Sequence, residues 1–485
     1  MLPHLLPLLT QQLNHADWKY REAGILALGA IADGCYEGMQ AHLAALIPVL
    51  VKTLHDEVPL VRSITCWTLG RYSKWTLTLP QGVDKNEFLG QYFRPMLEGF
   101  LQRVLDGNKK VQEAACSALA TVEEEARQEL IPFIEPILQT LVFAFGKYQS
   151  RNMLILFDAI GTLADAVGES LNNPKFIELL MPQLLAKYNA LTDDDPIVFP
   201  LLECLTSVAT ALGTGFAPYV PQIWTRCLQM ITMTLQQWVL HCQDPTKFID
   251  VDKDYIVISL DLLSGIAQGM SIHVEPFVAQ SQPPLMPLLF ECMKDVNGEV
   301  RQSAYALLGD LTITAFGVIR PTLGDILPLV IQQIDPEVQS SHSSACNNAA
   351  WSAGEIALKW REEIKPFIQP LMQRLVPLLN NERISLKALH ENAAITIGRL
   401  GLICPAEVAP YLPHFFRMWC SSLATIRDNM EKESAFMGMC RMIELNPGGV
   451  GGDLLLFCDA VVRWNKPGDN LNAYFKKVGL ALVLT

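Results

Sequence analysis

Apolar residues recur every three to four positions along almost the whole chain, and runs with a period of two are scarce. A period near 3.6 residues predicts amphipathic helices, so we expect an all-α fold. The helices come in pairs, and the second helix of each pair carries a small residue in similar apolar company. In the second half of the chain these residues are spaced 44, 45, 44 and 40 positions apart: Gly265, Gly309, Gly354, Gly398 and Gly438. We attribute the recurrence to packing, because glycine lets neighbouring helices approach closely.

A period of about 40–47 residues with two helices per unit is typical of HEAT and armadillo repeats. Several first helices contain an early proline, as at Pro48 and Pro366, where a missing N–H costs little. The sequence therefore predicts a HEAT-repeat superhelical solenoid of about ten to eleven helical pairs, forming a single array over residues 1–485. Neither end shows the polar outer face of a terminal repeat, so we expect the array to be part of a longer one.

Several segments interrupt the helical pattern. Residues 243–254 and 334–348 predict long polar connectors, which are either plain loops or contact sites on one rim. Residues 446–452 contain four glycines and predict a flexible turn, not a phosphate-binding loop, because no Lys-Ser/Thr follows and no strand precedes them. The uncharged residues 204–225 include two glycines and two prolines, so we expect no membrane span and a soluble protein.

Composition narrows the classes of function. Apolar residues make up 50% of the chain and charged residues 18%, which excludes a disordered protein. The net charge of −13 argues against direct binding of nucleic acid and favours basic partners. The 12 cysteines contain no C-x-x-C pair, so we expect reduced, mostly buried thiols in the cytosol or nucleus.

No catalytic or metal-binding motif is complete. His390 and Glu391 are followed by Ala394, where a zinc protease helix needs its second histidine, and neither a G-x-S-x-G elbow nor a P-loop occurs. His342 and Cys346 have the i, i+4 spacing of two metal ligands but lack a third ligand nearby. We therefore expect no metal, no cofactor and no enzymatic activity.

The faces of the second helices suggest a binding surface. In the helix from Leu154, an apolar stripe lies opposite Asp158, Thr162, Asp165 and Glu169, and the helices around residues 113–124 and 254–268 repeat this arrangement. A solvated face explains any one helix. Three of them together favour an acidic trough, which we expect on the concave side where second helices generally lie.

Two tryptophans stand opposite the core stripe of their helices. Trp67 shares its sector with Ile64 and Arg71, while Trp351 points away from an alanine-rich stripe, beside Asn347, Asn348 and Glu355. We interpret both as exposed residues that await a partner, whereas Trp360 counts as core. Such a surface suits an extended basic peptide, with tryptophans for apolar side chains, acids for arginines and asparagines for the peptide backbone.

At this point a family resemblance is visible. The segments that carry it are 63–69, 111–118, 158–165, 261–265 and 392–401. They resemble the transportin family of karyopherin-β import receptors, across essentially the whole chain and matching about the C-terminal half of the family's sequence. The resemblance implies a nuclear import receptor that binds extended basic proline–tyrosine nuclear localisation signals, for transport through the nuclear pore.

The resemblance also implies cargo-binding residues, and the helical faces had already indicated both tryptophans and most of the acids. The proline–tyrosine end would contact Leu26, Ile64, Trp67 and Arg71, and the arginine upstream would contact Glu124, Asp158 and Asp165. The middle of the signal would contact Asp261, Gln302 and Asp310. The N-terminal basic or hydrophobic epitope would contact Asn347, Asn348, Trp351, Asn392 and Ile395. Ser343 departs from the family's larger aliphatic residue, so we expect a weaker grip on hydrophobic epitopes there.

The partners implied are cargo proteins, often RNA-binding proteins, and nucleoporins, for a protein that shuttles between cytoplasm and nucleus. The family's N-terminal repeats for the Ran GTPase and its acidic loop are not in this sequence, so we expect a cargo-binding fragment that Ran does not unload normally. We expect no direct nucleic-acid or membrane partner. The alternative is a HEAT-repeat scaffold that holds folded subunits at its rims and tolerates loss of both tryptophans. A third possibility, an enzyme regulator with basic substrates, depends on the acidic trough alone.

Overall fold

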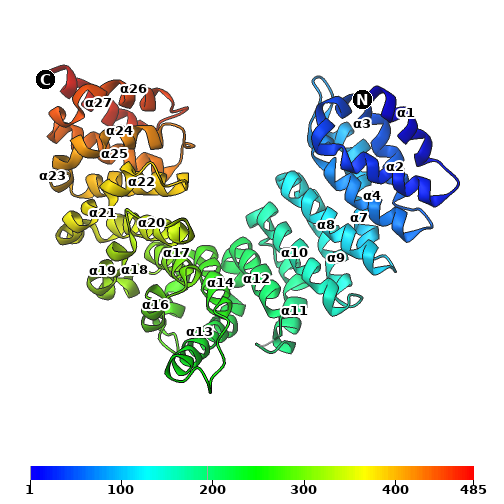
Figure 1. Ribbon diagram of the computed structural model, residues 1–485, viewed down its shortest axis with the longest axis horizontal. Coiled ribbons are helices and arrows are strands. Elements are labelled where there is room, and N and C mark those ends of the chain that lie inside the picture. Colours follow the sequence, from blue (N-terminus) through cyan, green and yellow to red (C-terminus); the bar gives the residue numbers. More distant parts are fainter. Residues whose placement is uncertain (1, 194, 485) are drawn as a thin grey trace. The chain divides into compact units, whose positions relative to one another are not determined.

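The computed structural model describes residues 2–193 and 195–484 (Figure 1). Within these residues all regular structure is helical, as the apolar period predicts, and it consists of 27 α-helices with short 3₁₀ segments and one π-helical turn. The chain divides into two compact units, Met1–Pro218 and Tyr219–Thr485, here called unit 1 and unit 2. Each unit is described by itself.

Unit 1 contains five helical pairs in its described residues. The first helices are α1 (Leu2–Leu13), α3 (Ala32–Thr53), α7 (Arg94–Val104), α9 (Ile134–Phe145) and α11 (Pro174–Ala190). The second helices are α2 (Trp18–Ala30), α4 (Pro59–Arg71), α8 (Lys109–Ala126), α10 (Ser150–Val167) and α12 (Val198–Leu212). Each second helix packs against the next, which forms a continuous layer from α2 to α12. The longest connection, between α4 and α7, holds α5 (Ser73–Leu77), α6 (Lys85–Phe88) and the π-helical turn η1 (Leu89–Phe93).

Unit 2 contains six pairs in the part of it that the structure describes. The first helices are α13 (Val220–Gln243), α16 (Leu285–Met293), α19 (Leu323–Gln333), α21 (Ile368–Asn380), α24 (Leu412–Leu423) and α26 (Leu454–Val462). The second helices are α14 (Asp254–Met270), α17 (Gly298–Thr314), α20 (Ser343–Trp360), α22 (Lys387–Ile403), α25 (Met430–Leu445) and α27 (Asp469–Leu484). They again form one layer. The total agrees with the ten to eleven pairs expected, while one array over residues 1–485 stays a prediction.

Two of the interruptions differ from expectation. The predicted connector 334–348 ends at residue 342, because α20 already begins at Ser343 and its first turns bury Ala345 and Cys346 against the core. The glycine-rich residues 446–452 lie mostly in a 3₁₀ segment, η10 (Pro447–Asp453), within which Gly451 has a φ of +57°. The connector between α13 and α14 spans residues 244–253, close to the predicted bounds.

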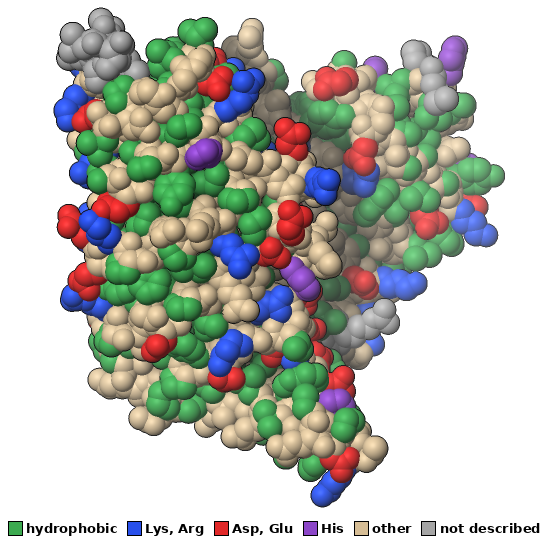
Figure 2. All heavy atoms as spheres, turned by 60° about the vertical axis from the view of Figure 1, so that its left-hand side comes forward, with side chains coloured by type: hydrophobic (Ala, Val, Ile, Leu, Met, Phe, Trp, Pro, Cys, Tyr) green, Lys and Arg blue, Asp and Glu red, His purple; other side chains and the backbone are tan. Residues whose placement is uncertain are grey.

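Apolar character extends to the surface as well as the core. In Figure 2, where unit 2 comes forward, hydrophobic side chains cover much of the visible surface of this unit, and acidic and basic ones are interspersed. By length and composition alone, two helical stretches could cross a membrane, Val198–Gln243 and Asp254–Ala279, or three if a bent pair counts as one. The first is broken at Gly213, where φ is +53°. Half of its most apolar window is buried inside the protein. The absence of a membrane span stays a prediction.

The cysteines behave as small buried hydrophobes, as expected. Nine of the twelve are buried and none forms a disulfide within the described residues. Burial raises the pKa of the Cys66 and Cys116 thiols to about 12. At neutral pH these thiols are protonated and unreactive.

Partly buried ion pairs join successive repeats of unit 1. Arg62 donates to both carboxylate oxygens of Asp106 at 2.9 Å, and Arg103 adds a third hydrogen bond at 3.0 Å. Arg21 and Asp56 repeat the arrangement one repeat earlier. Burial opposes the ionisation of Asp106, but hydrogen bonds from Arg62 and from the Asn108 N–H outweigh it and hold its pKa below the usual value. The same causes, with Arg21 and Val58, lower the pKa of Asp56.

These depressed pKa values predict acid-sensitive stability. A carboxylate with a lowered folded-state pKa stabilises the protein fully above its unfolded pKa, near ~4, and loses that contribution as the pH falls through the folded value. We expect Asp106→Asn to be less stable than the wild type at pH 7 and to lose less stability on acidification. Urea denaturation followed by circular dichroism between pH 7 and pH 3 measures both. Glu129→Gln, which breaks an exposed pair with Lys85, is the control. Equal pH dependence of Asp106→Asn and the wild type would contradict the prediction.

Candidate functional site

The proline–tyrosine end is predicted to bind around Trp67, in unit 1. Trp67 lies on α4 and is 38% exposed, which confirms the helical-face prediction, and Leu26 on α2 is 46% exposed. Ile64 is half-buried. The Arg71 guanidinium carbon lies 5.1 Å from the centroid of the Trp67 ring, and Arg71 also pairs with Asp33. An aromatic ring beside a cation held by a carboxylate is a fixed, partly apolar contact surface.

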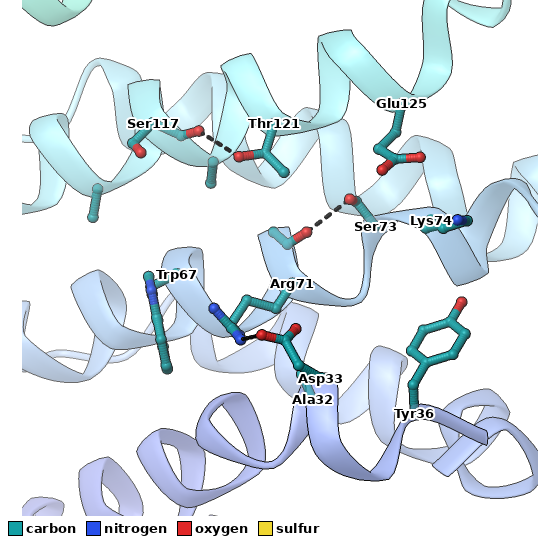
Figure 3. A pocket seen from close by; sticks show the side chains of 13 residues that line it. Ala32, Asp33, Tyr36, Trp67, Arg71, Ser73, Lys74, Ser117, Thr121 and Glu125 are labelled. Carbon is teal, nitrogen blue, oxygen red and sulfur yellow. Dashed lines mark hydrogen bonds and ion pairs between the residues drawn. The ribbon is translucent and has the colours of Figure 1, made fainter. Parts of the chain in front are cut away.

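A pocket of about 540 Å³ opens beside this tryptophan (Figure 3). Trp67 lies at one end of it and Tyr36 and Glu125 at the other, with Arg71 directed toward Asp33 between them. The wall formed by α8 contributes hydroxyl groups, among them that of Thr121. A side chain that enters would therefore meet an indole face, a guanidinium and several hydrogen-bonding groups.

The acids predicted to meet an arginine lie on the next second helices of unit 1. Glu124 on α8 and Asp158 and Asp165 on α10 are all exposed, and the apolar stripe of α10 is buried as predicted. The surrounding protein partly desolvates Asp158 and Asp165 and raises the pKa of each, although Asp165 accepts a hydrogen bond from Ser207 Oγ at 3.0 Å. A bound cation would favour their charged form.

Glu123 is a feature that the sequence analysis missed. Its side chain is fully buried, and neither carboxylate oxygen has a hydrogen-bond partner. Burial raises its pKa well above the usual value, with Asp158 and Glu124 adding to the shift. Its position seven residues after the buried Cys116 places it on the core stripe of α8, so helical phase was the signal that could have found it.

In unit 2 the predicted asparagines do lie together. Asn392 Nδ2 donates to Asn347 Oδ1 at 2.9 Å, Asn347 Nδ2 donates to Asn348 Oδ1 at 3.2 Å, and Asn348 Nδ2 donates to the Gln302 carbonyl at 2.9 Å. This chain of amides crosses α17, α20 and α22. The Gln302 side chain is exposed. The amides orient one another through these hydrogen bonds.

The interpretation of Trp351 as an exposed side chain is wrong. The residue is half-buried, and its Nε1–H donates to Glu431 Oε1 at 3.0 Å, from α25 two repeats further along. Glu355, expected as an exposed neighbour, is buried and accepts a 2.7 Å hydrogen bond from Arg399. Arg399 also lies 3.5 Å from Glu431. Trp360, expected in the core, is half-buried instead.

The remaining predicted residues offer less surface. Asp261 is half-buried, and Asp310 is buried and accepts hydrogen bonds from Ser264 and Gln268 across the contact between α14 and α17. Burial raises the pKa of both carboxyls. Ile395 is only 4% exposed. The roles of these residues in cargo binding stay predictions.

The described residues contain no cluster of three or more His, Cys, Asp or Glu that could hold a metal ion. Of the two residues with the spacing of metal ligands, His342 and Cys346, the cysteine is buried, and its Sγ lies 3.9 Å from the Asp335 carbonyl.

Comparison with known proteins identifies the family. Residues 18–72 match the HEAT-like repeat family, and residues 95–318 match the importin subunit beta-1-like TPR repeats. The chain is 50% identical over 478 residues to transportin-1 of Homo sapiens, covering 99% of this chain and 52% of that protein. It is 46% identical to importin subunit beta-2 of Schizosaccharomyces pombe, with the same coverage.

Solved structures agree on the fold. A chain in the solved structure of the Kap95:Nup1 complex superimposes with a TM-score of 0.72 at 14% identity. The match covers 99% of the present chain and 57% of the chain in that complex. The family of these relatives consists of non-enzymatic transport receptors. The chain spans about half the length of the curated relatives it matches. On the evidence of these sequence matches, the chain belongs to the importin-β family and is a homologue of transportin-1.

Proposed function

We propose that this chain is the cargo-binding part of a nuclear import receptor, and that it binds extended basic signals ending in proline–tyrosine on the layer of second helices. The observation that carries the proposal is the exposed Trp67 at the edge of a pocket, with Arg71 beside its ring. Ile64 lies on the same helix, α4, and Leu26 lies on the adjacent helix α2. The side chains of proline and tyrosine are largely apolar rings, and tyrosine adds one hydroxyl group. The indole suits the rings, and the polar groups of the pocket suit the hydroxyl.

The acids of unit 1 suit the arginine upstream of the dipeptide. Glu124, Asp158 and Asp165 are exposed on neighbouring second helices, and the chain as a whole carries a net charge of −13. A desolvated tryptophan anchor contributes roughly 2 kcal/mol or more, while an exposed ion pair contributes roughly 0.2–1 kcal/mol. The tryptophans would set the affinity, and the acids would set the association rate and selectivity.

The N-terminal epitope of the same signal would bind unit 2. Asn347, Asn348 and Asn392 would bond the peptide backbone, and the remaining exposed surface of Trp351 would contact its side chains. Asp261, Gln302 and Asp310 would line the middle. Because Trp351 is half-buried, we expect it to contribute less than Trp67.

The proposed partners follow from the family. They are cargo proteins with basic proline–tyrosine signals, among them RNA-binding proteins, and nucleoporins, and the chain would shuttle between cytoplasm and nucleus. A structurally similar chain is solved in a complex with Nup1, which supports the nucleoporin partner.

A titration tests the proposal. A fluorescent peptide with a basic N-terminal patch and an Arg-x-x-Pro-Tyr end is expected to bind with submicromolar affinity, and to lose binding when Pro-Tyr becomes Ala-Ala. Trp67→Ala should weaken binding by about 30-fold, since about 2 kcal/mol is lost. Phe143→Ala, an exposed aromatic on the first helix α9, is the control and should leave the affinity unchanged.

The opposite result would favour a scaffold. If the folded wild-type chain does not bind the peptide, the receptor proposal fails. A scaffold that holds folded subunits at its rims would then explain the repeats, and it should tolerate Trp67→Ala and Trp351→Ala.

A further inference from the structure

Trp67 occupies space that only a glycine leaves open. Gly29 lies near the end of α2, in the second helix one repeat earlier. A Cβ atom at this glycine would lie less than 3.0 Å from two carbons, Cζ3 and Cε3, of the Trp67 indole. Real Cβ atoms do not approach other atoms so closely, so any other residue at position 29 would displace the ring.

Trp351 stands in the same relation to Gly309. A Cβ atom there would lie less than 3.0 Å from three indole carbons, Cζ3, Cε3 and Cη2 of Trp351. Gly309 again belongs to the second helix one repeat earlier, α17, and again follows a leucine. Displacement of this ring would also strain the hydrogen bond from Trp351 Nε1 to Glu431.

Four other glycines of the second helices do not share this property. Cβ atoms at Gly70 and Gly161 would make ordinary contacts at 3.5 Å with neighbouring helices. Gly398 and Gly438 face backbone atoms of each other's helices instead of an aromatic ring. The combination of a glycine and an indole therefore occurs, among these second-helix glycines, at the two tryptophans that helical phase assigned to cargo binding.

We infer that Gly29 and Gly309 are positioning residues, each of which lets a cargo-binding tryptophan lie against the preceding second helix in the orientation that contacts the signal. This inference rests on the proposed function. At Trp67 the orientation matters twice, because Arg71 lies beside the ring and is itself held by Asp33. At Trp351 the orientation is fixed by Glu431 and by the glycine together.

Alanine substitution separates this role from general packing. We expect Gly29→Ala and Gly309→Ala each to weaken binding of the full peptide. The affinity should fall about tenfold in Gly29→Ala, compared with roughly 30-fold in Trp67→Ala. Gly38→Ala in unit 1 and Gly324→Ala in unit 2, where a Cβ atom meets an ordinary contact or open space, are the controls. Alanine favours helix over glycine, so the controls should fold at least as well as the wild type and bind equally.

A double-mutant cycle gives the decisive readout. A Cβ atom at Gly29 would also lie 2.7 Å from the Thr68 hydroxyl, which donates to the Ile25 carbonyl, so the cycle must separate this contact from the one with the indole. If Gly29 acts through the indole, Gly29→Ala should have no further effect on affinity in the Trp67→Ala background. Additive losses would overturn the inference. A peptide truncated to its proline–tyrosine half should respond to Gly29→Ala but not to Gly309→Ala.

A measurement without peptide tests the position of the Trp67 ring separately from peptide binding. With 5-fluorotryptophan incorporated, the ¹⁹F resonance of Trp67, assigned by its absence in Trp67→Phe, should shift in Gly29→Ala and stay in place in Gly38→Ala. A wild-type chain that binds no peptide overturns the proposed function and, with it, this role. A wild type that binds, with a Gly29→Ala variant that binds equally well, overturns the positioning role and leaves the proposed function standing.

Discussion

Replacing Arg399 with methionine should destabilise unit 2 by about 3–5 kcal/mol, the usual cost of leaving a buried charge without its partner. Arg399 is 4% exposed and donates to Glu355 Oε1 at 2.7 Å, and Glu355 is itself buried. Methionine can fill much of the volume of the arginine, but it cannot donate to the carboxylate. The Glu355 carboxyl would then stay buried and unpaired or take up a proton, and both alternatives cost free energy of folding.

Hydrogen exchange on the whole chain measures this effect. An array of repeats need not unfold in one transition, so the local free energy of opening is the useful quantity. Amides of α20, α22 and α25 should lose protection in Arg399→Met. Arg417→Met, which breaks an exposed pair with Asp453, should change protection by less than about 1 kcal/mol. Unchanged protection in Arg399→Met would contradict the prediction.

A second variant separates charge from packing. Replacing both Arg399 and Glu355 with apolar residues of similar size should recover most of the lost stability, because no unpaired charge remains. It should not recover the position of Glu431, which loses Arg399 in both variants. Since Glu431 holds the Trp351 indole, affinity for the N-terminal half of the signal should stay reduced in the double variant.

The sequence predicted the fold well because a repeat array is determined locally. The 3.6-residue apolar period defines each helix, and the spacing of Gly309, Gly354 and Gly398 defines the pairs, without knowledge of distant contacts. The predicted bounds of helices and connectors were less reliable. The polar residues 343–348 look like a connector, yet Ala345 and Cys346 among them pack into the core and extend α20.

The exposure of the candidate residues was predicted correctly where one helix determines it. Trp67 and the acids of α10 lie on faces that helical phase alone can assign, and the structure places them there. Trp351 and Glu355 were misjudged because their surroundings come from other repeats. Glu431 reaches Trp351 from a position 80 residues away in sequence. A helical wheel contains no information on such a partner.

The glycines of α22 and α25 lie against backbone atoms of each other's helices. A Cβ atom at Gly438 would overlap the carbonyl group of Gly398 and lie 2.7 Å from the Leu402 nitrogen. In the other direction, a Cβ at Gly398 would lie 2.6 Å from the Ala435 Cα. These are backbone atoms, so no side-chain rotation can relieve the overlap, and the two helices would have to separate.

Gly438→Ala is therefore expected to destabilise the contact between α22 and α25 by about 3 kcal/mol or more, the upper range for overpacking, despite a helix-propensity gain of up to about 1 kcal/mol. Amides of both helices should lose protection from hydrogen exchange. Gly161→Ala, whose Cβ would meet the Cys204 Cα at an ordinary 3.5 Å, should be neutral or stabilising. If the two variants were equally stable, close approach of the helices could not explain the glycines at positions 398 and 438. A large difference would show that these two glycines allow backbone contact between neighbouring repeats.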